Sequence, residues 1–291
     1  MKTIAVAALA GLLTAVAAQP DSRILDKENL VAWCIVPFDA KKRGPEERAA
    51  MLKRLGLRRM AYDWRKQHIP EFDAEIDALR RHGIRLEAFW ATVSEDDARN
   101  THLPVIFELL KRRRESPQIW LMFTPGGDFS FLPQEEKLKR AAATIRPVAV
   151  EAATVGSKVA LYNHGGWFGE PENQIAVLRE MRLKNTGLVY NFHHGRAHMD
   201  RFPELLSAMQ PFLLAINLNG MKAGAPMILP IGEGDREKEM IQSLVESGWK
   251  GRVGILNHQE DVDARVGLRR NLDGLERIKA KLSSTAKTVA P

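Results

Sequence analysis

The feature that most constrains the fold of this chain is an eightfold alternation between short apolar runs and amphipathic, charge-rich segments. The starts of the apolar runs recur roughly every 30 residues, the spacing that repeated βα units require. The apolar runs span residues 30–36, 58–62, 85–90, 118–123, 158–162, 187–191, 212–217 and 252–257. The helix-like segments span residues 45–55, 72–82, 103–114, 134–153, 172–183, 201–209, 236–246 and 263–282.

Eight such units predict an α/β fold in which parallel strands close into a (β/α)8 barrel, also called a TIM barrel. Apolar runs such as 213–216 lack strict alternation, which is typical of parallel strands that are buried on both faces. An open, doubly wound sheet is the main alternative. However, no G-x-G-x-x-G motif follows the first apolar run, and the sequence contains no P-loop. No linker divides the chain, so we expect a single barrel domain over residues 25–283.

The two ends of the chain lie outside this predicted barrel. Lys2, the apolar stretch 3–16 and the A-x-A-like end that follows predict a signal peptide over residues 1–18. The protein is therefore expected in a periplasm or outside the cell, with an uncleaved N-terminal anchor as the alternative. No other stretch is long and apolar enough to cross a membrane. Residues 284–291 are expected to form a frayed tail.

The cysteine content excludes an intramolecular disulfide, and the charge pattern does not favour a nucleic-acid partner. The single cysteine, Cys34, lies inside the first apolar run, so the fold uses no intramolecular disulfide. The formal net charge of +7 reflects a mild basic excess. Its densest run, 111–114, ends a helix-like segment, where cations complement the helix dipole. No aromatic residues are interleaved with it, so nucleic acid is not an expected partner.

The polar residues of interest follow the predicted strands. In a (β/α)8 barrel the active site is built at and just beyond the C-terminal ends of the strands. Here the fifth to eighth predicted strands end in amides and imidazoles, which donate and accept hydrogen bonds in fixed directions and suit a ligand with several hydroxyl groups. We therefore expect a sugar-like small molecule as the ligand. The predicted substrate-binding residues are Trp90, Tyr162, Asn163, Trp167, Asn191, His193, Asn217, Asn219, Lys222, Asn257 and His258.

The predicted catalytic residues are His164, His194 and Glu233. The two histidines follow strand ends in glycine-flanked turns, and an imidazole pKa can be tuned near neutral pH, where a general acid or base works best. Lys222 is expected to stabilise developing negative charge. Trp90 and Trp167 are expected to cover the apolar face of a sugar ring, with packing as the alternative role of each.

No metal ion or other cofactor is predicted. The strand ends that would supply hard, anionic ligands carry neutral groups, and amides bind divalent cations weakly unless carboxylates join them. An atypical divalent-metal site, made from His164 and His194 with Glu233 or Glu170, stays open as an alternative.

Five segments match a known pattern: VALYNHGGWFGEPEN, GLVYNFHHG, LLAINLNGM, ILPIGEGD and GILNHQ. With them the chain resembles the xylose isomerase-like barrel superfamily, which includes sugar-phosphate isomerases and epimerases and the endonuclease IV proteins. The resemblance covers essentially the whole mature chain and implies a (β/α)8 fold and a sugar-derived substrate.

The same resemblance implies a degenerate metal site. In the metal-dependent members, strands five to eight supply a glutamate, an aspartate, a histidine and a second glutamate as metal ligands. The matching positions here are Tyr162, Asn191, Asn217 and Asn257, and His194 stands where the family has a further histidine.

Two hypotheses about function follow. The first is an isomerase- or epimerase-like enzyme that transfers a proton beside the carbonyl of a sugar derivative through His164 and His194, with lyase activity left open. The second is a carbohydrate-binding barrel without catalytic activity, because the family's metal ligands are replaced. Nucleic-acid repair is not expected, since the family's repair enzymes need a multi-metal cluster that this chain lacks.

Overall fold

Eight parallel strands form the centre of the molecule. The computed structural model describes residues 21–288, with side chains to residue 284, so the predicted signal peptide over 1–18 lies outside the described residues. The strands are β1 (Leu30–Trp33), β2 (Arg59–Tyr62), β3 (Arg85–Ser94), β4 (Gln118–Thr124), β5 (Val159–Tyr162), β6 (Thr186–Asn191), β7 (Leu213–Leu218) and β8 (Arg252–Leu256). They pair in sequence order, and β1 pairs with β8, so the predicted closed barrel is confirmed.

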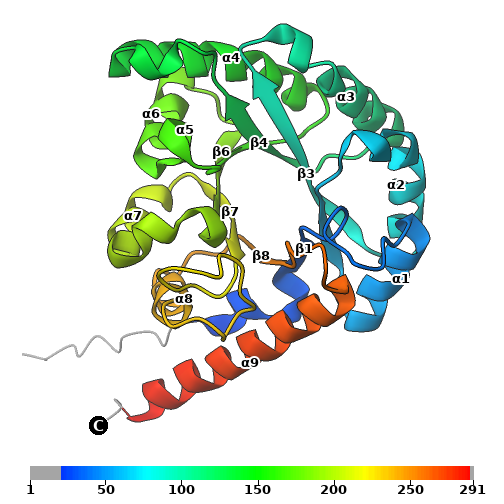
Figure 1. Cartoon of the computed structure of the whole chain (residues 1–291), viewed down its shortest axis with the longest axis vertical. Helices are drawn as coiled ribbons and strands as arrows, with labels where there is room; N and C mark the ends of the chain where they lie inside the picture. Colours follow the sequence, from blue (N-terminus) through cyan, green and yellow to red (C-terminus); the bar gives the residue numbers. More distant parts are fainter. Residues whose placement is uncertain (1–20, 289–291) are drawn as a thin grey trace, which may run out of the picture.

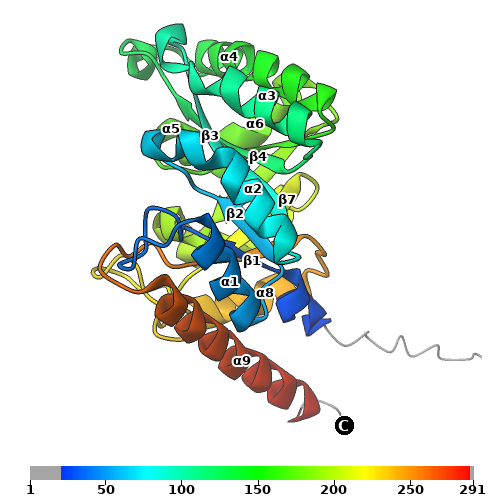
Figure 2. The same cartoon turned by 90° about the vertical axis from the view of Figure 1, so that its right-hand side faces the viewer.

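The helices form a ring outside the strands (Figure 1). They are α1 (Pro45–Leu55), α2 (Phe72–Arg81), α3 (His102–Arg113), α4 (Gln134–Thr154), the single turn α5 (Gly166–Gly169), α6 (Pro171–Met181), α7 (Phe202–Met209), α8 (Glu237–Glu246) and α9 (Ala264–Thr288). The long last helix, α9, lies beside α1 and so covers the seam where the barrel closes (Figure 2). Among the described residues no helix is both long and apolar enough to span a bilayer.

Two elements are longer than the sequence predicts. The third apolar run ends at Trp90, whereas β3 continues to Ser94 because its polar end pairs in register with β4, as far as Ser94 with Thr124. Helix α9 continues to Thr288, into the segment predicted to be frayed. Just before that segment, the Ser283 hydroxyl donates a hydrogen bond to the carbonyl of Lys279, one turn back along the helix.

Side chains fill the barrel interior from the N-terminal ends of the strands almost to their C-terminal ends. At the N-terminal ends of the strands, the buried Glu87 carboxylate lies 2.7 Å from Arg59 and 3.4 Å from Arg252. Above it, small and large side chains alternate in one cluster: Val31, Trp33, Cys34, Ala61, Ala88, Trp120, Ala160, Tyr162, Val189, Ala215 and Leu256. The interior is therefore a packed core, and polar side chains that could meet a ligand lie above Tyr162.

Outside the barrel, α1 and α2 are joined by a buried ion pair between Arg48 and Glu75, whose side chains are 2% and 1% exposed. Burial raises the pKa of the Glu75 carboxyl, while Arg48 opposes that rise. Removing only the arginine would leave a buried carboxyl without its partner.

We predict that Arg48→Met lowers the free energy of unfolding by about 3–5 kcal/mol, because Glu75 stays buried and unpaired. The double variant Arg48→Met, Glu75→Leu should regain most of that loss, since neither charge is then desolvated. Urea unfolding followed by circular dichroism measures both. A double variant as unstable as the single one would show that the unpaired charge is not the cause.

Candidate functional site

Four histidines meet at the C-terminal rim of the barrel. His164 follows β5, His193 and His194 follow β6, and His258 follows β8. The ring centroids are 4.4 Å apart between His164 and His194, 4.4 Å between His193 and His194, and 5.0 Å between His193 and His258. We call these four residues the histidine cluster. The structure thus brings together the two predicted catalytic histidines and the two predicted to bind substrate.

Two buried asparagines hold the turns that carry the cluster. Asn191 donates its backbone N–H to Oδ1 of Asn163 at 2.7 Å, and Asn163 donates its amide to the carbonyl of Asn191 at 3.2 Å, which ties the end of β5 to the end of β6. Asn191 also accepts from the backbone N–H of His193 at 3.1 Å and donates to the Tyr162 hydroxyl at 2.5 Å. Asn163, predicted to bind substrate, therefore has a structural role here.

The environment of the cluster keeps its imidazoles neutral. Burial, and then the neighbouring His193, His164 and His258, lower the pKa of His194 from 6.5 to about 2. Burial followed by the charges of His193 and Arg65 lowers the pKa of His258 to about 4. Burial also lowers the pKa of His164 and of His193.

The neutral rings keep unused hydrogen-bonding capacity. The buried nitrogens His193 Nδ1, His194 Nε2 and His258 Nδ1 have no hydrogen-bond partner in the described structure. A neutral imidazole offers one donor and one acceptor. Most buried polar atoms in folded proteins are paired, so three unpaired ring nitrogens in one cluster are unusual.

Aromatic contacts extend the cluster around the rim. Phe38 stacks on His258 with centroids 4.0 Å apart, and the Arg65 guanidinium lies 5.4 Å from the ring centroids of both Phe38 and Trp90. Trp90 was predicted to end its strand, but it lies inside β3 and is half-buried against the barrel interior. On the other side, the Tyr162 ring lies 5.6 Å from that of His194.

Asp63, which follows β2 and is buried, is not among the predicted site residues. Its Oδ1 accepts from the backbone N–H of Val36 at 3.2 Å, and its Oδ2 has no partner. Burial raises the pKa of this carboxyl to about 6, with Arg65 opposing the rise. Its position directly after a predicted strand could have identified Asp63 as a site residue, and the same holds for Arg65.

The prediction that Asn257 faces the same rim as Tyr162, Asn191 and Asn217 is wrong. Leu256 is the inward residue at the end of β8, so its neighbour Asn257 points outward, because side chains alternate along a strand. Asn257 donates to the carbonyls of Phe38 and Gln259 at 2.7 and 3.1 Å, and its Oδ1 lies against Gly267 of α9.

Two other predicted site residues are engaged elsewhere. Glu233 is exposed, and its carboxylate pairs with Arg270 of α9 at 2.7 Å. The Trp167 ring packs edge-on against Phe129 with centroids 5.2 Å apart, and its Nε1 donates to Gln134 at 2.7 Å. The structure thus gives each a packing or pairing role away from the histidines.

The loop after β7 carries the remaining predicted residues. Asn217 is fully buried beside Gly254 of β8, and neither of its amide atoms has a partner. Asn219 donates to the carbonyl of Gly220 at 2.8 Å and keeps Oδ1 unpaired. Lys222 is half-buried, and its carbonyl accepts from Arg196 at 2.7 Å.

The four residues that stand where metal-dependent members of the resembled superfamily have their ligands do not fit a divalent cation. Burial raises the pKa of the Tyr162 hydroxyl, which keeps it protonated, and the three amides are neutral. Glu170, of the alternative metal set, pairs with His198 at 3.1 Å and Arg201 at 3.0 Å. Within residues 21–284, no group of three histidine, cysteine, aspartate or glutamate side chains is arranged to hold a metal ion.

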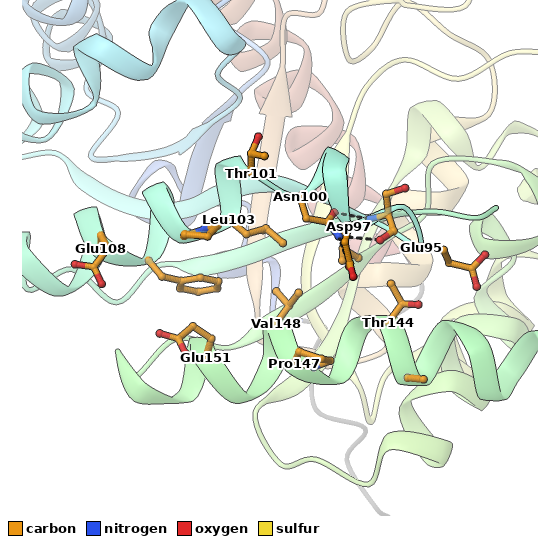
Figure 3. Close-up of a pocket in the computed structure, with 15 residues that line it drawn as sticks. Glu95, Asp97, Asn100, Thr101, Leu103, Glu108, Thr144, Pro147, Val148 and Glu151 are labelled. Atoms are coloured by element: carbon orange, nitrogen blue, oxygen red, sulfur yellow. Dashed lines mark hydrogen bonds between the residues drawn. The ribbon is translucent and has the colours of Figure 1, made fainter.

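A cavity of about 890 Å³ lies away from the cluster, between α3 and α4 (Figure 3). Two of its polar groups already have partners: Asn100 bonds to both backbone groups of Ser94 at 2.8 Å, and Glu95 pairs with Arg140 at 2.8 Å. The histidine cluster offers unpaired polar atoms at the strand ends, so we take it as the candidate site.

The fold is similar to that of several solved structures, among them proteins described as xylose isomerase domain proteins. The 3-keto-D-glucoside 4-epimerase YcjR from E. coli has a TM-score of 0.67 at 14% identity, covering 87% of this chain and 99% of that one. The IOLI protein with a bound zinc atom has a TM-score of 0.69 at 13% identity, covering 87% and 99%. A xylose isomerase domain protein from Planctomyces limnophilus has a TM-score of 0.67 at 14% identity, covering 88% and 99%. No protein-family model and no curated protein sequence matches this chain.

The lowered histidine pKa values predict a pH dependence of stability. Below pH 6.5 the unfolded chain binds protons that the folded cluster cannot accept, so the free energy of unfolding falls as the pH drops from 6.5 towards 4. Asp63 acts in the opposite direction, because a raised carboxyl pKa favours the folded state as the pH falls through 6.

Comparing the pH dependence of the free energy of unfolding between variants separates the contribution of the histidines from that of Asp63. His194→Asn should lose less stability than the wild type between pH 7 and pH 5, as measured by urea unfolding. His82→Asn, which alters a histidine of the α1–α2 surface paired with Glu46, is the matched control and should follow the wild type more closely. Equal pH slopes for wild type and His194→Asn would contradict the assignment.

Proposed function

We propose that the histidine cluster transfers a proton at the carbon next to the carbonyl group of a sugar derivative. The observation that carries the proposal is the contact between neutral imidazoles from separate strand ends, with buried ring nitrogens that lack partners. Imidazole is the side chain best suited to give and take protons near neutral pH.

His164 and His194 suit different roles. His164 is exposed, so its protonated form retains contact with water, and we assign it as the base. His194 is held strongly in its neutral form, so we assign its ring N–H as the donor to the carbonyl oxygen. A neutral histidine that polarises a carbonyl is an established arrangement in another (β/α)8 enzyme.

The proton transfer balances as follows. His164 accepts the proton from the carbon, the electron pair of the C–H bond forms a C=C bond, and the carbonyl oxygen becomes an enolate oxygen that His194 hydrogen-bonds. Return of the proton to the neighbouring carbon, with a hydroxyl proton passing to the first oxygen, gives an isomer. Protonation of the first carbon on its opposite face by a second imidazole gives an epimer; that imidazole regains a proton from water, and His164 releases its own proton to water.

Two observations support a sugar-derived substrate. Two buried amides at the end of β7 and just after it, Asn217 and Asn219, have unpaired hydrogen-bonding atoms of the kind that suits hydroxyl groups. The structurally similar YcjR is a 3-keto-D-glucoside 4-epimerase, and such chemistry includes a carbonyl in the sugar ring. Lys222, in the same loop, is a second group that could approach developing negative charge.

The experiment is solvent exchange. The wild-type protein is incubated in D₂O with a panel of aldoses, ketoses and keto-glycosides, and deuterium incorporation beside the carbonyl is followed by NMR. We expect incorporation on at least one compound. The double variant His164→Asn, His194→Asn should lower its rate by roughly 10²–10⁴-fold, the usual contribution of a positioned acid or base.

The control is His82→Asn, which removes a histidine outside the cluster and should keep the wild-type rate. Unchanged exchange in the double variant would refute the assignment of the two histidines. Tight sugar binding by a wild type that incorporates no deuterium anywhere in the panel would instead favour the carbohydrate-binding hypothesis.

A further inference from the structure

The group that remains unexplained at the rim is the guanidinium of Arg65, in the loop between β2 and α2. Its Nη1 donates to the backbone carbonyls of Asp63 at 2.8 Å and Trp64 at 2.9 Å. Its guanidinium carbon lies 5.4 Å from the ring centroids of Phe38 and Trp90. The side chain is therefore held in one orientation by two carbonyls and two rings.

The charge of Arg65 has no anionic partner. The residue is half-buried, and an arginine side chain stays protonated at all ordinary pH values. None of the ion pairs in the described part of the chain includes Arg65, whereas arginines such as Arg48 and Arg140 pair with carboxylates. The nearby Asp63 carboxylate accepts instead from the backbone N–H of Val36.

Its unused donors are the second observation. The contacts described for the guanidinium all use Nη1, which leaves Nε and Nη2 without a hydrogen-bond partner among the described residues. Arg196, which also lies in a rim loop, differs because its Nη2 is occupied by the carbonyls of Lys222 and Gly224. A planar guanidinium with free N–H groups matches the geometry of a carboxylate or phosphate.

Ring contacts place Arg65 beside the histidine cluster. Phe38 touches both the Arg65 guanidinium and the His258 ring, and His258 in turn contacts His193. An anion held by Arg65 would thus belong to a molecule that also reaches the imidazoles. Two arginines act on the cluster, Arg65 on His258 and Arg196 on His193, and Arg65 is the one of the two whose Nη2 has no hydrogen-bond partner among the described residues.

We propose that Arg65 binds the anionic group of the substrate, so that the site takes a sugar acid or a sugar phosphate in preference to a neutral sugar. The identity of the reaction rests on the proposed function above, but the binding of the anion does not. Carboxylate and phosphate share the chemistry that a guanidinium recognises, and the test has a separate arm for each.

The test is isothermal titration calorimetry of the full chain with matched sets of ligands: glucose, glucuronate and glucose 6-phosphate, and the corresponding galactose and mannose sets. The wild type should bind at least one anionic member roughly tenfold or more tightly than its neutral counterpart. Arg65→Gln should remove that advantage, a weakening of roughly tenfold to a hundredfold, and leave the affinity for the neutral sugar unchanged.

Two further variants control the result. Arg65→Lys keeps the charge but loses the planar fork, and should regain part of the preference for the anion. Arg54→Gln removes an exposed arginine of α1 and should bind like the wild type. Thermal unfolding of each variant verifies that it is folded. A preference for the anion that survives Arg65→Gln, or no preference for any anionic member, overturns the proposal.

Solvent exchange on the same samples separates this inference from the proposed function. Anion binding that depends on Arg65, without deuterium incorporation on any ligand, supports the anion site and refutes proton transfer. Deuterium incorporation by a wild type that shows no preference for any anionic member supports proton transfer and refutes the anion site.

Discussion

Pairing of β1 with β8 is the contact on which the rest of this structure depends. Four residue pairs join the two strands in register, from Leu30 with Val253 to Trp33 with Leu256. Once the sheet closes, all eight C-terminal strand ends lie on one rim, and loops far apart in the sequence become neighbours. That is how His258, after the last strand, meets His193, after the sixth.

The packed interior then determines the chemistry at the rim. Trp33, Trp120 and Tyr162 fill the barrel below the rim. The side chains of the histidine cluster lie above them, partly withdrawn from water, and none is paired with a carboxylate in the described part of the chain. In such surroundings an imidazole is more stable when neutral, and close neighbours of the same kind add to this effect. The cluster is therefore a group of neutral donors and acceptors, with Arg65 near His258 and Arg196 near His193 as charged groups.

The sequence predicts the fold almost completely, because the alternation of apolar and amphipathic segments repeats eight times. It also identifies the histidines, since position after a strand is visible in a linear pattern. It fails for Asn257, because successive side chains of a strand point alternately towards the barrel axis and away from it. A shift of one position along the sequence therefore moves a side chain to the opposite face. It fails for Glu233 as well, because the partner, Arg270, lies on a helix that reaches this loop only in the folded chain. The position of Arg65 after a predicted strand is evident from the sequence, but its lack of a carboxylate partner becomes evident only in the folded structure.

We propose that imidazoles perform the proton transfer without a metal ion. The most direct measurement is the solvent-exchange rate of the wild-type protein before and after exhaustive chelation, with metal content determined on the same sample. The account predicts an unchanged rate at far less than one metal ion per chain. Loss of exchange on chelation, restored by one equivalent of zinc, manganese or magnesium, would contradict it.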